Sequence, residues 1–289
     1  MTRTVVLGDL MVDVLVRLSG PLAPGSDVAA SIRFNGGGSA ANTAAWLAAA
    51  GASPVLVGRV GNDARGRSAV EELTAGGVDA RLAVDGELPT GTCVVLVGPD
   101  GERTMAPDAG ANEALAEGDL GADLLEEGGH LHVSGYALLR PGSRTAARAA
   151  IARAVDAGMS VSVDPSSSAL LSDAFLDDAE GAGLLLPNAS EAHALTGESA
   201  PERAARMLAG RFGEVVVKLG ADGALWTNGE EVLRAAALPV DAPVDTTGAG
   251  DAFAAGLLAA RAAGASTAES LAAGCKLAAR AVGTPGARP

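Results

Sequence analysis

The stretch VDTTGAGDAF, residues 244–253, opens a long apolar segment that runs to Ala263. Glycines at a helix start leave backbone N–H groups free to point at an anion, and the helix dipole favours negative charge at this end. The stretch therefore predicts a phosphate cradle. Asp251 would repel a bound phosphate unless it handles a proton or a metal, so we interpret it as a general base. An Asp that caps a helix after a glycine turn is the alternative interpretation.

Short β-branched runs alternate with Ala-rich helical segments along the rest of the chain. This alternation is typical of βαβ units, so we expect an α/β fold in which helices cover both faces of a mainly parallel sheet. The predicted strands are TVVLGD, PVLVGRV, LHVSG, SVSVD, GLLLP and EVVVKLG, and the predicted helices are 40–50, 64–75, 143–157, 201–210 and 249–263.

Two regions, Pro21 to Phe34 and Thr90 to Pro107, contain strands and turns with no helix after them. In the second region, a turn at Pro99-Asp100-Gly101 between two short apolar runs predicts a hairpin. We expect these pieces to form a small antiparallel flap, about residues 14–34 and 90–107, over the end of the parallel sheet.

The composition excludes several classes of protein. The 289 residues include 21 basic and 35 acidic side chains, and a net charge of −14 would repel nucleic acid and anionic membranes. No apolar run approaches the ~18 residues of a membrane span. The N-terminus carries Asp9 and Asp13 and lacks a cleavage site, so we expect a cytoplasmic protein. Cys93 and Cys275 lack metal-ligand spacing and predict neither a disulfide nor a zinc site.

The same composition bears on domain organisation. With 48% hydrophobic residues and no linker or repeat, residues 1–289 are expected to form one domain. Only the final GTPGARP is expected to be poorly ordered.

A second glycine cluster, NGGGSAAN at residues 35–42, precedes another Ala-rich helix. Consecutive glycines allow close approach of backbone to a ligand, and Asn42 offers a donor and an acceptor to a hydroxyl, which suits a polyol. A tight loop packed on alanines is the alternative. Neither glycine cluster matches a dinucleotide fingerprint, and Lys218 and Lys276 do not follow the spacing of a P-loop.

Other polar groups follow predicted strands. Asp9 and Asp13 flank the end of the first strand, where open α/β sheets bind ligands; Asp9 is interpreted as a turn residue, and Asp13 is left open between the two roles. Asn188 and Glu191 have a spacing suited to ordering hydrated Mg²⁺, but taken by itself this spacing favours an N-cap with a capping-box partner.

The loop KLGADG at residues 218–223 joins two apparent strands and either admits a nucleotide or forms a plain hairpin. The three histidines lack triad partners and Ser166 to Ser168 lack a recognisable base, so none is taken as catalytic.

Taken together, these segments resemble the ribokinase-like (PfkB) sugar kinase family. The match spans nearly the whole chain in order, through GDLMVD, GGGSAANTA, PTGTCVVL, GERTMAPDAGAN, LPNASEAHALTG, VVKLGADGA and DTTGAGDAFAAGLL. The resemblance implies a three-layer α/β/α sandwich with a small β-strand lid, and an enzyme that uses ATP, Mg²⁺ and a monovalent cation, K⁺.

The resemblance also implies a role for each matching residue. Asp251 would deprotonate the acceptor hydroxyl while the N–H groups of Gly248, Ala249 and Gly250 stabilise the transferring phosphoryl group. Acceptor binding falls to Asp13, Gly37, Gly38 and Asn42, with Met105 of the lid packing on the sugar or a base. Nucleotide and metal binding fall to Asn188, Lys218, Gly220 and Gly223, to Glu191 for Mg²⁺ through water, and to Asp245 and Thr247 for K⁺.

Two departures from the family pattern bear on the substrate. Tyr136 stands where ribokinases carry a glutamate after the LHVSG strand, which argues against ribose. Ser166 to Ser168 follow Asp164-Pro165 where fructokinase-like members carry an Asn-x-Arg pattern, and the missing arginine argues against an acidic or phosphorylated sugar.

The main hypothesis is therefore an Mg·ATP-dependent kinase that phosphorylates a primary hydroxyl of a small neutral sugar or related polyol. The alternatives are a ribonucleoside kinase and a non-catalytic sugar-binding sensor, against which the intact GAGD with Asp251 argues. A Rossmann dehydrogenase lacks the early fingerprint. Because exposed strand edges are often buried by pairing, a homodimer through the lid is expected.

Overall fold

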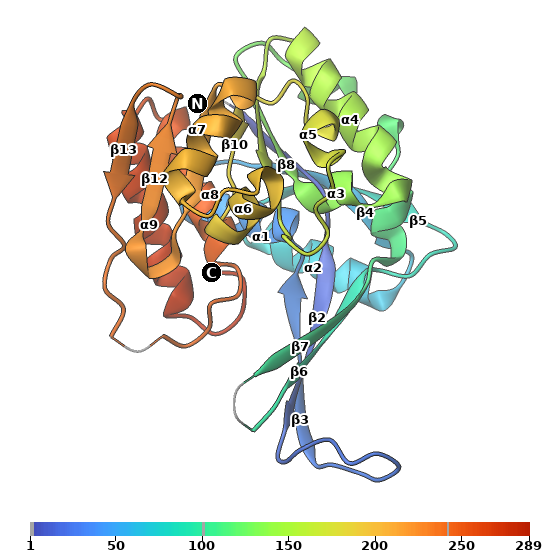
Figure 1. Ribbon diagram of the computed structural model, residues 1–289. Coiled ribbons are helices and arrows are strands. Elements are labelled where there is room, and N and C mark those ends of the chain that lie inside the picture. Colours follow the sequence, from blue (N-terminus) through green and yellow to red (C-terminus); the bar gives the residue numbers. More distant parts are fainter. Residues whose placement is uncertain (1–2, 100–101, 242) are drawn as a thin grey trace.

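The main sheet of the computed structural model, which describes residues 3–99, 102–241 and 243–289, contains nine strands (Figure 1). Their order is β13-β12-β11-β10-β9-β8-β1-β4-β5, and all neighbours from β11 to β5 pair in parallel while β12 and β13 are antiparallel. The bounds are β1 Thr4–Leu7, β4 Val55–Gly61, β5 Asp79–Asp85, β8 His130–Ser134, β9 Ser160–Asp164, β10 Leu184–Leu185, β11 Glu214–Lys218, β12 Ala224–Thr227 and β13 Val232–Ala235.

Helices cover both faces of this sheet, because its central strands are apolar on both sides. In β1, Val5 and Leu7 pack into one core and Val6 packs into the other, and all three are essentially buried. The core with Val6 contains α1 Ser39–Ala49, α2 Ala64–Ala75, α8 Ala249–Ala262 and α9 Thr267–Val282; the opposite core contains α3 Gly135–Leu139, α4 Pro141–Asp156, α5 Phe175–Asp178, α6 Ala189–Thr196 and α7 Pro201–Phe212.

Short 3-10 helices complete the body of the protein. Three of them lie between the small sheet described next and β8, and the fourth joins β11 to β12. Their bounds are η1 Gly110–Ala114, η2 Glu117–Asp119, η3 Ala122–Leu124 and η4 Gly220–Asp222.

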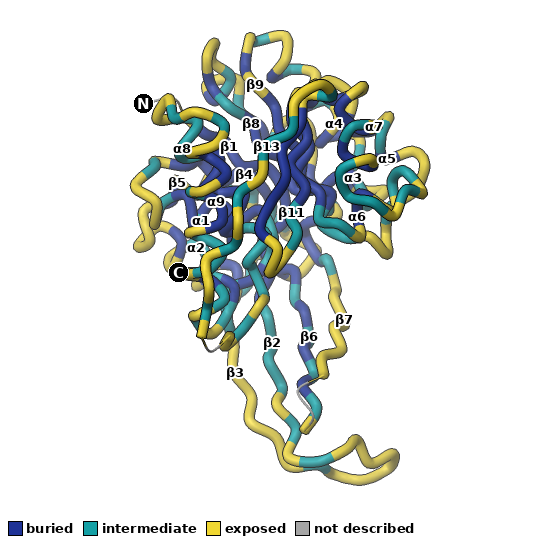
Figure 2. The backbone as a smooth tube through the Cα atoms, turned by 60° about the vertical axis from the view of Figure 1, so that its left-hand side comes forward, coloured by how far each residue is buried: buried dark blue, intermediate teal, exposed yellow. Residues whose placement is uncertain are grey.

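Four further strands form a separate small sheet that projects from the body (Figure 1). Its two outer strands are mostly exposed, whereas its two inner strands are mainly buried or half-buried (Figure 2). We call it the small sheet: β2 Met11–Leu18, β3 Ala30–Gly37, β6 Thr92–Val97 and β7 Arg103–Asp108, in the order β3-β2-β6-β7. It begins earlier than the predicted residue 14, and the predicted turn residues 100 and 101 lie outside the described residues.

The prediction of a purely antiparallel flap was wrong at one pair. β2 pairs with β6 in parallel, whereas β2–β3 and β6–β7 are antiparallel. The physical reason is that β2 follows β1 and β6 follows β5, and both parent strands end at the same edge of a parallel sheet. Both segments therefore leave the body in the same direction.

Several elements were not predicted, among them β5, β13, α3, α5 and α9. Helix α9 carried a usable signal: Ser266 and Glu269 form a capping box at its start, the S-x-x-E spacing of a helix N-terminus. The described part of the chain contains no helix with the length and apolar character of a membrane span.

The C-terminal segment also differs from its prediction. Instead of poor order, the carbonyl of Ala287 accepts a hydrogen bond from Trp46 Nε1 at 2.9 Å, and Gly286 N–H donates to Asp245 at 3.3 Å. Trp46 is fully buried in α1, so the last residues pack against the helix that follows the second glycine cluster.

Candidate active site

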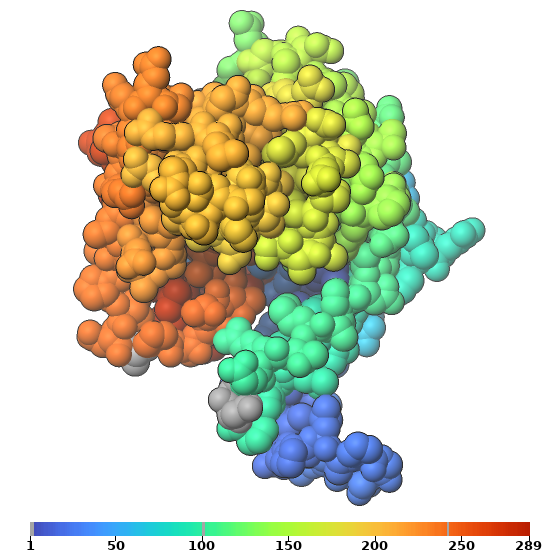
Figure 3. Space-filling model, in the orientation of Figure 1, coloured from blue at the N-terminus to red at the C-terminus, as the bar shows by residue number. Residues whose placement is uncertain are grey.

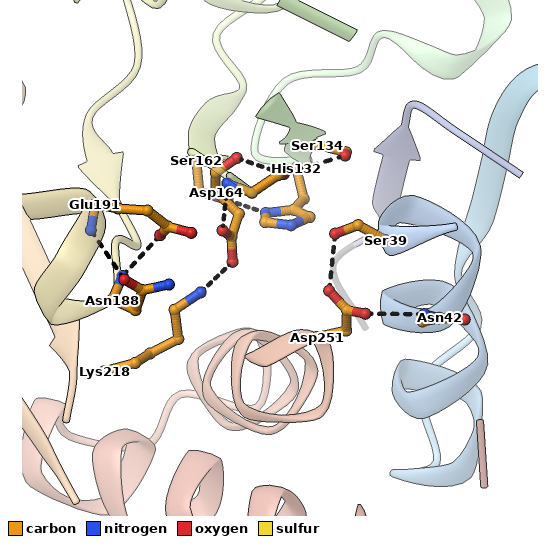
Figure 4. A network of polar contacts seen from close by, with 11 residues as sticks. Ser39, Asn42, His132, Ser134, Ser162, Asp164, Asn188, Glu191, Lys218 and Asp251 are labelled. Carbon is orange, nitrogen blue, oxygen red and sulfur yellow. Dashed lines mark hydrogen bonds and ion pairs between the residues drawn. The ribbon is translucent and has the colours of Figure 1, made fainter. Parts of the chain in front are cut away.

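Asp251 lies in the first turn of α8 and points at the start of α1 (Figure 4). Ser39 Oγ donates to its Oδ1 at 2.7 Å, and Asn42 Nδ2 donates to its Oδ2 at 2.9 Å. Burial raises the pKa of Asp251 to about 7, because it outweighs these two hydrogen bonds, which favour the ionised form. A carboxylate with a pKa near neutrality is suited to accept a proton.

Gly248 sets the N-terminus of α8. Its φ of 76° is left-handed, and a Cβ there would lie 2.4 Å from the carbonyl oxygen of Ala287, so only glycine fits. The first backbone N–H groups of a helix have no partner within it. The N–H of Ala249 is an exception to the predicted cradle, because it closes a turn on the carbonyl of Thr246 at 3.3 Å. Gly248 and Gly250 are left as the better anion donors.

Four of the predicted acceptor residues, Asp13, Gly37, Gly38 and Asn42, form a cluster that reaches Asp251 through Asn42. A Cβ on Gly37 would lie 2.4 Å from Asp13 Oδ1, and one on Gly38, with φ of 91°, would lie 2.6 Å from a backbone carbonyl. Asn42 contacts Asp251 directly. Burial raises the pKa of Asp13 to about 6, with Asp9 and Asp245 adding to the rise and Arg288 opposing it.

Arg288 is a residue of this cluster that the sequence analysis missed. Its Nη2 donates to the carbonyl of Gly37 at 2.8 Å, its Nε to Asn42 Oδ1 at 3.2 Å, and its Nη1 to Glu72 at 2.8 Å. The side chain is 8% exposed. No motif surrounds it, and it comes from the segment that was expected to be poorly ordered.

Asp9, which was interpreted as a turn residue, anchors the start of α1. It is 4% exposed and accepts hydrogen bonds from the N–H of Ser39 at 3.0 Å and from Ser134 Oγ at 2.8 Å. A carboxylate that accepts from the first N–H groups of a helix stabilises its N-terminus. Asp9 thereby holds α1 where Asn42 and Ser39 reach Asp251.

Tyr136 and Met105, the other two predicted acceptor residues, lie on different elements, α3 and β7. Tyr136 follows β8, with the guanidinium of Arg140 5.5 Å from its ring centre, and burial together with the charges of Asp9 and Asp251 raises its pKa to about 12. Met105 lies on β7 and is 56% exposed. Because alternate strand residues share a face, Met105 lies on the same face of β7 as Arg103.

A buried charge cluster lies on the other side of Asp251 (Figure 4). Lys218 Nζ donates to Asp164 Oδ2 at 2.5 Å, and their side chains are 13% and 5% exposed. Asn188 and Glu191 form a reciprocal capping box at the start of α6, at 2.9 and 2.8 Å. Burial raises the pKa of Glu191, with Asp164 adding to the rise and Lys218 opposing it.

A cavity of about 580 Å³ extends from this cluster along α8 and α9. The surface is hollowed between the C-terminal part of the chain, in orange, and the green strands of the small sheet (Figure 3). Lys218, Gly220 and Gly223 line the cavity beside Gly250, so the loop 219–223 is both a hairpin connection and a cavity wall. The remaining wall is mostly apolar, from Ala237, Leu238, Pro239, Val240, Ala278, Ala279 and Val282.

The comparisons with known proteins agree with this geometry. The family model of pfkB family carbohydrate kinases matches residues 1–289. The chain belongs to this family.

Named relatives of this PfkB kinase act on different acceptors. The chain is 36% identical over 265 residues to the ATP-dependent ribose-1-phosphate kinase of Halopiger xanaduensis, covering 90% of this chain and 84% of that protein. It superposes on the adenosine kinase of Sinorhizobium meliloti with a TM-score of 0.90 at 27% identity, covering 100% and 95% of the two chains. It superposes on the fructokinase of Vibrio cholerae, which was solved with fructose, ADP and calcium, with a TM-score of 0.85 at 29% identity. This superposition covers 99% of this chain and 94% of the fructokinase chain.

These findings confirm the predicted ribokinase-like α/β fold and the enzyme class. The protein is an ATP-dependent sugar kinase. Membership of this kinase family implies ATP as the donor and a divalent metal.

The described residues contain no group of three or more His, Cys, Asp or Glu side chains placed to hold a metal. Mg²⁺ in proteins usually keeps several waters and is bound through one or two carboxylates and the phosphates of a nucleotide. The carboxylate of Glu191 is buried beside Lys218 and Asp164.

The loop Asp245–Thr247, for which the resemblance implies K⁺, contacts the small sheet. Arg103 Nη1 donates to Asp245 Oδ1 at 2.9 Å and to Thr247 Oγ1 at 2.6 Å. Burial alone would raise the pKa of Asp245, but its hydrogen bonds with Thr247, the charge of Arg103 and the N–H of Gly286 hold it below its ordinary value. Like Arg288, Arg103 was not singled out by the sequence analysis.

Proposed function

We propose that this PfkB kinase transfers the γ-phosphate of Mg·ATP to a primary hydroxyl of a small neutral sugar or related polyol, with Asp251 as general base. The observation that carries the proposal is the position of Asp251. It lies at the N-terminus of α8 and accepts a hydrogen bond from Asn42, whose Oδ1 is joined through the guanidinium of Arg288 to the carbonyl of Gly37. A hydroxyl held by Asp13 and Asn42 would therefore have its proton within reach of Asp251.

In this mechanism the triphosphate enters from the cavity lined by Gly220, Gly223 and Ala279. The acceptor oxygen attacks the γ-phosphorus, the bond to the bridging oxygen of ADP breaks, and the acceptor proton passes to Asp251. The free N–H groups at the start of α8 and the ammonium of Lys218 stabilise the transferring group. Mg²⁺ would neutralise phosphate charge, with Glu191 and Asn188 ordering its waters.

The charge of the acceptor site favours a neutral sugar. Asp13 and Glu72 supply negative charge, and the guanidinium of Arg288 is already paired with Glu72 and the carbonyl of Gly37. An acceptor phosphate would have to compete for Arg288 and would meet Asp13. Hydroxyl groups match the carboxylate of Asp13 and the amide of Asn42 better.

A phosphorylated sugar is the second candidate, because Arg288 places one guanidinium among the acceptor residues. The relative from Halopiger xanaduensis is named for ribose 1-phosphate. If this chain shares that acceptor, the pair between Arg288 and Glu72 must open on binding.

A coupled ADP-release assay separates these acceptor classes. The panel contains pentoses, hexoses, keto-sugars, polyols, ribose 1-phosphate and nucleosides, each with Mg·ATP, and the Asp251→Asn variant serves as the blank. Turnover on an unphosphorylated sugar or polyol supports the main proposal. Turnover confined to ribose 1-phosphate favours the second candidate, and turnover confined to nucleosides favours a ribonucleoside kinase. No turnover on any acceptor while ATP binds would favour a sugar-binding sensor.

The pH dependence of kcat/KM should follow Asp251. Because its pKa in the free enzyme is about 7, kcat/KM is expected to rise with pH and level off above about 7. Protonation is favoured in the fold relative to the ordinary value of 3.8, so the contribution of Asp251 to stability is largest at low pH and is lost as pH rises from 3.8 through about 7. Initial rates across this range test the prediction.

The control for this profile is Asp13→Asn, since Asp13 has a pKa of about 6. The variant should bind the acceptor more weakly, and its kcat/KM should still rise with pH up to about 7. If kcat/KM of the wild type does not change with pH, or if the pH of its rise shifts in Asp13→Asn, the pH dependence would have to be assigned to a group other than Asp251.

The small sheet supports a proposed homodimer. Its edge strands are β3 and β7, and Ile32 and Phe34 on β3 are 58% and 63% exposed. Pairing of two small sheets would bury these edges and side chains. We expect the mass of a dimer in light scattering at micromolar concentration and the mass of a monomer for Ile32→Glu/Phe34→Glu. A wild-type monomer would contradict the proposed homodimer.

A cytoplasmic location, where ATP is available, is part of the proposed function.

A monovalent cation at Asp245 and Thr247 stays a prediction from the resemblance. Both side chains accept a hydrogen bond from Arg103, so K⁺ would have to displace or share that guanidinium.

A further inference from the structure

The contact between Arg103 and the loop Asp245–Thr247 joins two parts of the molecule that are far apart in sequence. Arg103 begins β7 of the small sheet, and the loop leads directly into α8. One guanidinium nitrogen donates to both Asp245 and Thr247, and the Arg103 and Asp245 side chains are 36% and 21% exposed. This ion pair joins the small sheet to the loop that leads into α8.

Both oxygens of the Asp245 carboxylate accept hydrogen bonds in this arrangement. Its Oδ1 accepts from Arg103 and from the N–H of Thr247 at 2.9 Å, and its Oδ2 accepts from the N–H of Gly286 at 3.3 Å. A potassium ion needs several oxygen ligands with lone pairs turned toward it, and a guanidinium at hydrogen-bond distance repels a second cation. The donor set does not fit K⁺ while Arg103 is seated.

The charges around the site explain why a cation is needed at this loop. Asp245 and Asp13 interact electrostatically, and Asp251 lies six residues beyond Asp245. A triphosphate would bring further negative charge to the same place. Lys218 offsets charge beside Asp164, and Arg288 offsets charge beside Asp13. Asp245 is paired with neither of them and has Arg103.

We infer that Arg103 is a positioning residue for phosphoryl transfer, which carries from the small sheet the positive charge that the loop Asp245–Thr247 requires and makes the reaction independent of K⁺. The inference rests on the proposed function. Arg103 acts through Asp245 and Thr247 by fixing the turn that orients the first N–H groups of α8, and it neutralises Asp245 when phosphate charge develops nearby.

The experiment compares the wild type with Arg103→Ala, Arg103→Lys and Arg17→Ala in the ADP-release assay. Arg17 is the matched control, because it is an exposed arginine on β2 of the same small sheet. Each protein is assayed in K⁺ and in tetramethylammonium at equal ionic strength. The wild type should show the same kcat in both salts. Arg103→Ala should lose about 10- to 100-fold in kcat in tetramethylammonium, with the Kd for ATP little changed, and should recover part of the loss in K⁺. Arg103→Lys should retain most of the activity.

A second readout does not depend on activity. The melting temperature of each protein without nucleotide is measured in the two salts, and binding of the potassium analogue Tl⁺ is followed by thallium NMR. We expect Tl⁺ binding and K⁺ stabilisation for Arg103→Ala and neither for the wild type or Arg17→Ala.

The outcomes separate this inference from the proposed function. If the wild type turns over no acceptor, the proposed function fails, while the melting and thallium data still decide the cation question. Wild-type activity that requires K⁺, or an Arg103→Ala variant that behaves like Arg17→Ala in rate and in Tl⁺ binding, would overturn the role of Arg103.

Discussion

Asp251→Asn is expected to lower kcat by about 10²- to 10⁴-fold, the range that a lost general base typically costs. The substitution keeps the size of the side chain and leaves an oxygen that can still accept from Ser39 or Asn42. It removes the group whose pKa of about 7 allows it to take the acceptor proton at neutral pH. Since Asp251 faces α1 while the cavity along α9 is lined by other residues, the Kd for ATP should stay close to that of the wild type.

The measurement is single-turnover ADP formation together with ATP binding by calorimetry. Ser39→Ala is the matched control, because it removes a 2.7 Å hydrogen bond to Asp251 and leaves the carboxylate in place. The kcat of that variant should fall by less than about 10-fold. The rise of its kcat/KM should move to higher pH, since the lost hydrogen bond favoured the ionised form of Asp251. Turnover of Asp251→Asn within a few-fold of the wild type would remove Asp251 from the role of base.

Local patterns were sufficient for the framework of this protein. VDTTGAGDAF places glycines and a carboxylate at a helix start, and the structure has Gly248 in the left-handed region followed by α8. The alternation of β-branched runs and Ala-rich segments gave the parallel sheet, because periodicity and strand length are properties of a few adjacent residues. The capping-box spacing of Asn188 and Glu191 was read in the same way, and the structure shows that box.

Contacts across the fold could not be found in this way. Arg103 reaches a loop 142 residues away, and Arg288 reaches Asn42 across 246 residues. Nothing in the neighbours of either arginine marks its partner, since pairing depends on how the small sheet and the C-terminal segment fold over the body. The parallel pairing of β2 with β6 was missed for the same reason.

The unforeseen position of Arg288 also bears on the predicted acceptor. The missing Asn-x-Arg after Asp164-Pro165 argued against a phosphorylated acceptor, yet the fold brings Arg288 from the end of the sequence to Gly37 and Asn42, two of the predicted acceptor residues. We therefore expect the choice between neutral and phosphorylated acceptors to depend on the charge balance of Arg288, Glu72 and Asp13.

The same electrostatic reasoning gives the largest expected effect on stability. Lys218→Met should lower the free energy of unfolding by about 3–5 kcal/mol, the usual result of leaving a buried charge without its partner. The lost ammonium bonds Asp164 at 2.5 Å, and the pKa of Lys218 is raised mainly by Asp164 and Glu191 against the effect of burial. Methionine fills a similar volume, so the loss reports charge more than packing.

Asp164→Asn in the Lys218→Met background should recover most of this stability, because it removes the carboxylate that the first substitution leaves unpaired. Urea unfolding at neutral pH, analysed as a double-mutant cycle, measures the coupling. Arg203→Met is the control: its pair with Glu198 is exposed and screened by water, so its unfolding midpoint should stay near that of the wild type. If Lys218→Met unfolds at the same urea concentration as Arg203→Met, the Lys218–Asp164 pair does not stabilise the fold, and the charge cluster beside Asp251 must be neutralised by other groups.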